Sequence, residues 1–299
     1  MDVAGEFVTV AANGLEFEVL AAGSGDRLAL CLHGFPEHAI SWRHQIPLLV
    51  RLGYRVWAPN QRGYGNTSRP RAVEAYDPKH LVADVAALID ASGATSVTLI
   101  GHDWGAAIAW LFAIKRVRPL EKLVILNVPH PGPFSRALRH SARQRLRSWY
   151  MAFFQLPALP EYLLGLGGAR AIGAAFSRSA CDPSRFPKEV LDFYRARASE
   201  PGALGAMLAW YRAAARGGMA AQLSGGIATI DVPTLLLWGE EDVALGKETT
   251  YGTDRYVSDL QVQYLPGASH WVQQDAPDRV NERLAAFLGD GAREVVPTS

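Results

Sequence analysis

Short apolar runs alternate with helix-like segments along the first 126 residues, and this alternation constrains the fold more than any other feature of the sequence. Four runs have the composition of buried parallel strands: residues 28–32, 55–58, 97–100 and 122–126. Helical periodicity lies between them, notably over residues 78–91 and 106–115. Because strand and helix alternate at the spacing of α/β proteins, the chain is predicted to form a mostly parallel sheet with helices on both faces.

An N-terminal hairpin is predicted ahead of this series. Asn13-Gly14 lies between two runs of strand character, residues 7–10 and 15–20. Asn and Gly tolerate the positive φ angles that a two-residue hairpin turn requires. The pair therefore predicts two antiparallel strands joined by a tight turn.

The alternating pattern ends near residue 132, and from there to about residue 226 only helical periodicity remains. Strand character returns at residues 233–238 and 260–265, and a last helix is expected over residues 277–288. Helical insertions of this kind commonly form a lid over the carboxyl ends of the strands, where such sheets bind ligands. The predicted division is an α/β core of residues 1–131 and 227–299 and an all-helical cap of residues 132–226.

The strongest chemical signal is a Gly-x-Asp-x-Gly turn at residues 101–105, which follows an apolar strand and precedes a helix. This is the pattern of a nucleophile elbow, with Asp103 where serine usually stands. The glycines keep the neighbouring backbone clear of a strained turn. An Asp that only caps the helix is the alternative, but its position after the third run of the parallel series favours catalysis. His102 is expected to point to the opposite face as a structural or pocket-lining residue.

A carboxylate nucleophile forms an ester, so a second group must activate water to hydrolyse it. His270, in the loop after the last predicted strand, is the candidate base. The acid that orients it should come from an adjacent strand end, where Glu240, Glu241 and Asp242 all qualify by spacing. The order nucleophile, acid, histidine is the order that a nucleophile elbow on an α/β sheet requires.

A turn at residues 33–36, His-Gly-Phe-Pro, follows the first buried run. The backbone N–H groups of Phe35 and Trp104 are predicted to form the oxyanion hole, facing negative charge on the attacked ester. His33 is then expected to brace the loop rather than act as a base.

On these residues the chain closely resembles the epoxide hydrolases of the α/β-hydrolase superfamily, over nearly its whole length. The motifs that carry the resemblance lie at residues 33–36, 62–67, 101–105, 238–242 and 268–271. The resemblance implies the α/β-hydrolase fold and hydrolysis of an epoxide to a vicinal diol through a hydroxyalkyl ester on Asp103. It also selects Asp242, the last residue of the Gly-x-x-Asp turn, as the acid.

The same resemblance implies that two cap tyrosines, Tyr150 and Tyr211, hold the epoxide oxygen. Ala209 stands where the family usually has Asn, a small departure near the second site. Either tyrosine could instead belong to a packed helix face. The aromatic residues around them predict an apolar pocket that takes an aryl-bearing epoxide: Trp149, Phe153, Phe154 and Trp210.

Two other functions share parts of this pattern. Haloalkane and haloacid dehalogenases use the same Asp nucleophile, and Trp104 and Trp149 could hold a halide. Haloalkane dehalogenases usually carry Asn where this chain has Phe35, and haloacid dehalogenases of the fluoroacetate type carry Arg and Trp where it has Trp104 and Tyr150. A catalytically silent protein that binds a small apolar ligand is the other alternative, which the intact nucleophile, acid and base disfavour.

Composition limits the partners. The formal net charge of +1 predicts no bulk attraction to nucleic acid or anionic membranes, and the five arginines of residues 136–147 are interpreted as a solvated helix face. The two cysteines and eight histidines lack metal-ligand spacing, so no metal or other cofactor is expected. Without a secretory signal or an apolar run long enough to span a bilayer, the prediction is a cytoplasmic enzyme acting on a small apolar epoxide and water. The sequence does not define the oligomeric state, and a homodimer is one expectation.

Overall fold

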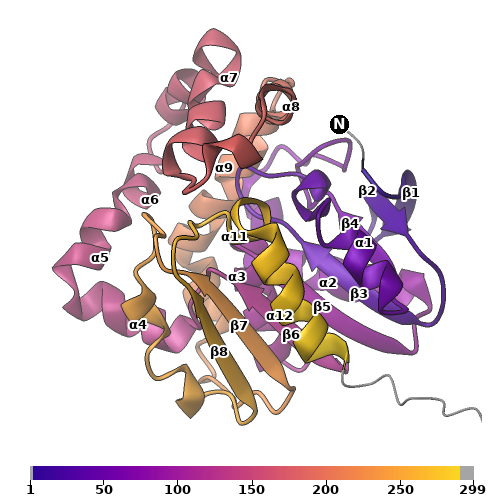
Figure 1. Ribbon diagram of the computed structural model, residues 1–299. Coiled ribbons are helices and arrows are strands. Elements are labelled where there is room, and N and C mark those ends of the chain that lie inside the picture. The colour runs from indigo at the N-terminus through magenta and orange to yellow at the C-terminus, as the bar shows by residue number, and fades with distance from the viewer. Residues whose placement is uncertain (1–2, 290–299) are drawn as a thin grey trace, which may run out of the picture.

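The computed structural model describes residues 3–289, which form an eight-stranded sheet with helices on both faces (Figure 1). The strands are β1 (Glu6–Ala12), β2 (Leu15–Ala22), β3 (Arg27–Leu32), β4 (Arg55–Pro59), β5 (Ser96–His102), β6 (Lys122–Leu126), β7 (Thr234–Gly239) and β8 (Leu260–Leu265). Their spatial order is β1-β2-β4-β3-β5-β6-β7-β8. All pairs from β4 to β8 are parallel, and only β1–β2 and β2–β4 are antiparallel. The predicted mostly parallel sheet is confirmed.

The predicted hairpin is also confirmed. β1 and β2 pair in a register that sets Ala12 opposite Leu15, so Asn13 and Gly14 alone form the turn. Both turn residues have positive φ, 48° and 70°. Such angles match the twist of the two strands, which is why Asn-Gly closes hairpins well.

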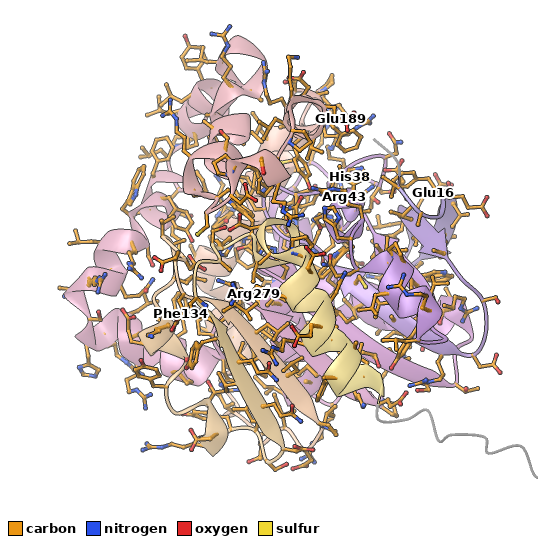
Figure 2. The ribbon with its side chains drawn as sticks, viewed as in Figure 1. Glu16, His38, Arg43, Phe134, Glu189 and Arg279 are labelled. Carbon is orange, nitrogen blue, oxygen red and sulfur yellow. The ribbon has the colours of Figure 1, made fainter. Side chains whose placement is uncertain are left out.

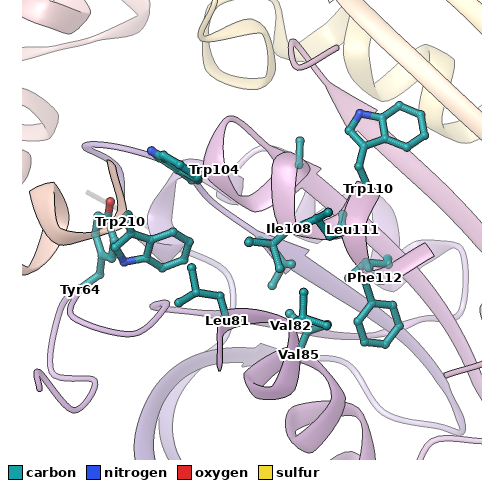
Figure 3. Close-up of a cluster of buried hydrophobic side chains, with 14 of the residues drawn as sticks. Tyr64, Leu81, Val82, Val85, Trp104, Ile108, Trp110, Leu111, Phe112 and Trp210 are labelled. Atoms are coloured by element: carbon teal, nitrogen blue, oxygen red, sulfur yellow. The ribbon is translucent and has the colours of Figure 1, made fainter. Parts of the chain in front are cut away.

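The central strands are buried on both faces, which explains their uninterrupted apolar character. In β3, Leu28 and Leu30 pack into one cluster of buried side chains, whereas Ala29 and Cys31 pack into the other. This is the two-residue period of a strand. Helices α2 (Pro78–Ser92) and α3 (Trp104–Ile114) cover the first face, and α1 (Ile46–Arg51) and α12 (Pro277–Gly289) cover the second. Figure 3 shows part of the first cluster, where α2 meets α3.

Only helices and turns occur between β6 and the isolated bridge at Ile230 in the described structure. They are α4 (Pro131–His140), α5 (Ala142–Arg147), α6 (Trp149–Phe153), α7 (Leu159–Ser179), α8 (Lys188–Ala198), α9 (Ala203–Ala213) and α10 (Met219–Gln222), with a π-helical turn at Ala214–Gly218. In Figure 1, α6 to α9 lie above the sheet and α4 and α5 form one flank. None of the helices described over residues 3–289 combines the length and apolar character needed to cross a bilayer.

Short elements account for the differences from the sequence prediction. Helices α1 and α11 (Val272–Asp275) have six and four residues, too few for a periodic pattern to reveal them. Single 3₁₀ turns lie at Ala39–Trp42, Val73–Tyr76, Pro183–Arg185, Lys247–Thr250 and Thr253–Arg255. Helix α3 begins two residues before the predicted start, directly after Asp103.

Polar and aromatic contacts hold the helical insertion against the loops at the carboxyl edge of the sheet. Arg69 forms an ion pair with Glu200 at 3.0 Å, and the Trp210 indole donates to the Arg62 carbonyl at 3.1 Å. The His38 ring lies 4.9 Å from the ring of Phe193 in α8. Figure 2 shows His38 beside Arg43, beneath the helices. The insertion therefore packs directly over the strand ends.

Candidate active site

The turn between β5 and α3 holds Asp103 in an unusual backbone conformation, with φ 47° and ψ −123°. A non-glycine residue rarely adopts positive φ, and the strain persists only where the surroundings impose it. A Cβ atom on Gly105 would lie 2.2 Å from the Leu32 carbonyl oxygen, and one on Gly101 would lie 2.7 Å from the backbone of Ala106. Both glycines are therefore required for the tight turn.

The turn after β3 lies directly against the Asp103 carboxylate. The Phe35 N–H donates to Asp103 Oδ1 at 2.6 Å. A Cβ atom on Gly34 would stand 2.3 Å from the same oxygen, so only glycine permits this approach. Trp104 is the first residue of α3, and its N–H belongs to the helix N-terminus beside Asp103.

His270 lies between two carboxylates. Its Nδ1 is 2.6 Å from Asp242 Oδ2, and its Nε2 is 3.6 Å from Asp103 Oδ2. Of the three acidic residues that spacing left open, Asp242 is buried against the histidine, Glu240 pairs with Lys247 at 2.5 Å, and Glu241 is exposed. Geometry alone thus singles out Asp242.

His270 and Asp103 shift each other's pKa. Burial on its own would lower the pKa of His270, but the charges of Asp242 and Asp103 and their hydrogen bonds outweigh it, and the pKa lies well above its ordinary value. Burial would raise the pKa of Asp103, but hydrogen bonding to His270 and its charge outweigh it, and that pKa is lowered. Each of these two side chains thus favours the charged form of the other.

Asn127 is a site residue that the sequence interpretation missed. Its Nδ2 donates to Asp242 Oδ2 at 2.8 Å, and its Oδ1 accepts the Gly239 N–H at 2.8 Å. The Ala244 and Leu245 N–H groups donate to the other Asp242 oxygen, each at 2.8 Å. These donors fix the Asp242 carboxylate, whose Oδ2 lies 2.6 Å from His270 Nδ1. The only signal in the sequence is an Asn at a strand end, a residue that tolerates the observed φ of 49°.

Glu37 is a second missed residue, buried beneath the site. Its Oε2 accepts the Gly34 N–H at 3.0 Å and lies 2.7 Å from His102 Nδ1. His102 Nε2 is 2.8 Å from the His270 carbonyl oxygen. Burial would raise the pKa of Glu37, but the charge and hydrogen bond of His102 outweigh it, and the pKa is lowered. His102 thus connects the Glu37 carboxylate to the backbone of His270.

This buried pair joins the parts of the site. Gln273 and Gln274 of α11 donate to the other Glu37 oxygen at 2.9 and 2.8 Å. The Gly34 turn, the elbow and the loop of His270 thus share one carboxylate. His102 lies beneath the elbow, as expected. His33 also braces its loop, because its Nε2 accepts the Gln61 N–H at 3.1 Å.

Tyr150 of α6 and Tyr211 of α9 meet above the elbow. Their ring centroids are 6.1 Å apart, and Tyr211 lies 4.9 Å from the Trp104 ring and 5.4 Å from the Phe35 ring. Burial raises the pKa of both phenols, and the negative charge of Asp103 raises it further. Both side chains therefore remain protonated hydrogen-bond donors at neutral pH.

The predicted pocket residues divide between the two sides of α6. The expectation that Trp149 lines the pocket is wrong, because its side chain is 64% exposed. Residues four apart share a helix face, so Tyr150 and Phe154 point inward together, and Trp149 and Phe153 form the other pair. The Phe154 ring lies 4.9 Å from Tyr211, whereas the Phe153 ring pairs with Trp149 at 6.0 Å and with Phe154 at 5.8 Å. Periodicity in the sequence did not separate the inner side of α6 from its outer side, so all these aromatic residues were assigned to one pocket.

Trp210 is also placed differently from the prediction. It is buried, and its ring packs 5.9 Å from both Tyr64 and Trp104 (Figure 3). It packs against Trp104 within the buried apolar cluster. Within residues 3–289 no group of three or more His, Cys, Asp or Glu side chains could hold a metal ion.

Comparison with known proteins matches most of the chain to one family and to relatives named epoxide hydrolases. The family model described as alpha/beta hydrolase fold matches residues 30–277. Epoxide hydrolase 4 of Mus musculus is 38% identical, over 96% of this chain and 80% of its own length. Epoxide hydrolase A of Mycobacterium tuberculosis is 36% identical, over 92% of this chain and 95% of its own length.

Solved structures give the same result. A Bacillus megaterium epoxide hydrolase in complex with an inhibitor superposes with a TM-score of 0.86 at 29% identity, covering 94% of this chain and 100% of that one. Epoxide hydrolase A from Mycobacterium thermoresistibile gives a TM-score of 0.83 at 35% identity, covering 95% of this chain and 98% of its own.

Proposed function

This chain belongs to the epoxide hydrolases of the alpha/beta hydrolase fold family, and we propose that it converts a small apolar epoxide and water to a vicinal diol through an ester on Asp103. One observation carries the proposal. The strained elbow presents a partly buried, ionised carboxylate to His270 on one side and to two protonated tyrosines on the other. We assign residues 132–226 as the cap that supplies the tyrosines.

In the first half-reaction, Asp103 attacks a ring carbon while Tyr150 and Tyr211 donate hydrogen bonds to the ring oxygen. The carbon–oxygen bond of the strained ring breaks, and an ester bond to Asp103 forms. The new alkoxide takes a phenolic proton. Loss of the Asp103 charge removes one of the two carboxylates that keep His270 protonated, so its pKa falls. The proton that His270 releases restores the phenol.

In the second half-reaction, neutral His270 takes a proton from water, and the hydroxide attacks the ester carbonyl. The Phe35 and Trp104 N–H groups stabilise the oxyanion. The ester bond to the diol breaks, the departing alkoxide takes the remaining water proton, and Asp103 becomes a carboxylate again. His270 keeps the first proton, which restores the resting charges. Asp242 and Asn127 hold the ring in place throughout.

A single turnover in water enriched in heavy oxygen (¹⁸O) tests this function. With enzyme in excess over styrene oxide, the diol should receive its new oxygen from Asp103 and carry no label. The label should appear in the peptide that contains Asp103, which mass spectrometry detects. Label in the first-turnover diol would mean direct attack by water and would refute the ester mechanism.

Tyrosine substitutions test the cap residues. We expect Tyr150→Phe and Tyr211→Phe each to slow ester formation by about 10²-fold, because one donor to the developing oxyanion is lost. The double variant should leave almost no activity. Tyr162→Phe is the matched control, since that cap tyrosine is 65% exposed. Phe preserves packing, so rates equal to the control in stopped-flow measurements would mean that both tyrosines are only structural.

The dehalogenase alternative shares the fold, the Asp nucleophile and the histidine, but its suggested halide site has little support. A halide site between Trp104 and Trp149 would need both indoles enclosed, yet Trp149 is largely exposed. Phe35 and Phe154 flank Tyr211 with apolar rings, which suits an apolar, aryl-bearing epoxide. A cytoplasmic location and a homodimer stay predictions.

A further inference from the structure

Exposed apolar side chains gather on one part of the cap. Twelve large apolar residues are exposed within residues 3–289, and seven of them lie on the stretch that runs from α5 to the first half of α7. We call these seven the cap apolar face: Leu146, Trp149, Leu156, Leu159, Tyr162, Leu163 and Leu166. Scattered exposed apolar residues are normal, but a concentration of them indicates a surface that binds a protein, a membrane or a ligand.

The segments that carry the cap apolar face are held together. Arg212 donates to the carbonyls of Phe154 and Leu156 at 3.0 and 2.8 Å and forms an ion pair with Glu161 of α7 at 2.5 Å. These bonds fix the turn after α6 against the start of α7. In Figure 1, α5, α6 and α7 follow one another along the outer edge of the molecule.

An arginine flank adjoins the cap apolar face. It consists of Arg136, Arg139, Arg143, Arg145 and Arg147 on α4 and α5, and no Asp or Glu occurs between residues 122 and 160. Arg136 and Arg145 donate only to backbone carbonyls, and none of the five forms an ion pair among the described residues. The first carboxylate after this stretch, Glu161, is already neutralised by Arg212. The flank is therefore a locally uncompensated positive surface on a nearly neutral chain.

We propose that the cap apolar face and the arginine flank dock together on an anionic lipid surface. Leucine, tryptophan and tyrosine are suited to the boundary between headgroups and acyl chains, and arginine binds phosphate. A second copy of this chain fits less well, because a symmetric contact would bring two arginine flanks together. The arginines that the sequence analysis interprets as a solvated helix face would therefore bind the phosphates of the anionic lipids.

The docking surface is directly connected to the proposed site. Trp149 lies on the outer side of α6, and the adjacent Tyr150 lies on the inner side with Phe154. A docked enzyme would hold its cap tyrosines about one helix width from the lipid boundary, where apolar epoxides partition. The docking goes beyond the proposed function and can be tested without turnover.

Vesicle binding with a matched pair of variants provides the first test. We expect the wild-type chain to sediment with vesicles of phosphatidylcholine and phosphatidylglycerol in equal parts, and about tenfold less with phosphatidylcholine alone. Arg143→Gln combined with Leu146→Ser should weaken binding by about tenfold. The control, Val50→Ser with Arg51→Gln, likewise replaces one exposed apolar residue and one exposed arginine, but on α1, at the other side of Figure 1. It should bind like wild type.

Tryptophan fluorescence provides the second test. All eight tryptophans lie within the described residues, and Trp149 alone is exposed. Brominated acyl chains in the anionic vesicles should quench emission, and Trp149→Phe should remove the quenching. Unchanged thermal unfolding and turnover of a water-soluble epoxide confirm that each variant folds.

Three outcomes would overturn the proposal. They are absence of wild-type binding to the anionic vesicles, equal loss of binding in both double variants, and a dimer that the Arg143 and Leu146 changes dissociate in sedimentation velocity experiments. The last would show that the face is an interface between copies of the chain.

Discussion

Asp103→Asn is expected to lower kcat by at least about 10⁴-fold, because a neutral amide oxygen cannot open the epoxide ring. Asn has nearly the same shape, keeps an oxygen for the Phe35 N–H and tolerates the positive φ of the elbow. The loss should therefore be chemical rather than structural. Steady-state turnover of styrene oxide measures it, and intact mass shows that the variant has not deamidated. Wild-type-like turnover without deamidation would remove Asp103 from the mechanism.

The same variant tests the electrostatics of the site. Without the Asp103 charge, one of the two carboxylates that raise the pKa of His270 is lost, so that pKa should fall. In the wild type, the raised folded-state pKa adds stability that is fully present below the unfolded value of about 6.5 and is lost as pH rises through the folded-state value. The variant should lose this contribution at a lower pH. NMR titration of the imidazole and thermal unfolding against pH measure both effects.

His270→Gln is expected to stall the enzyme after the first half-reaction. Asp103 can still open the ring, but no base remains to activate water, so kcat should fall by about 10⁴-fold and the ester should accumulate. Intact mass after incubation with styrene oxide should rise by the mass of the whole epoxide, and digestion should map the gain to the Asp103 peptide.

His140→Gln, a change at an exposed histidine of α4, is the matched control and should accumulate no ester. A simple haloalkane distinguishes the related chemistry. An adduct of the alkyl group alone, formed only from the haloalkane, would assign the chain to the dehalogenases. No adduct from either compound would contradict Asp103 as the nucleophile.

Local patterns made much of the molecule predictable. The Asn-Gly turn, the apolar strands and the Gly-x-Asp-x-Gly elbow are each defined by neighbours within a few residues. Their conformations depend on φ preferences and side-chain periodicity, which the sequence displays directly. The chain order of Asp103, an acid within residues 240–242 and His270 was also visible, because each follows a strand of a parallel sheet whose carboxyl ends meet at one edge.

Spacing and periodicity in the sequence did not predict where individual side chains point or which distant residues they contact. Glu240, Glu241 and Asp242 are consecutive and chemically similar, and only the path of the loop after β7 turns one of them toward His270. Trp149 and Tyr150 are adjacent on a short helix, and only packing against Phe154 and Tyr211 decides which side faces inward.

The sequence alone therefore determined the parallel sheet, the helical insertion and the candidate residues for the chemistry, because these depend on local conformation and chain order. Tertiary structure alone decided that Asn127 holds Asp242 and that Glu37 joins the elbow to the histidine loop. It also decided that an arginine flank lies beside an exposed apolar face. The physical reason is that such contacts join residues far apart in the chain, whose distances are fixed only when the whole core packs.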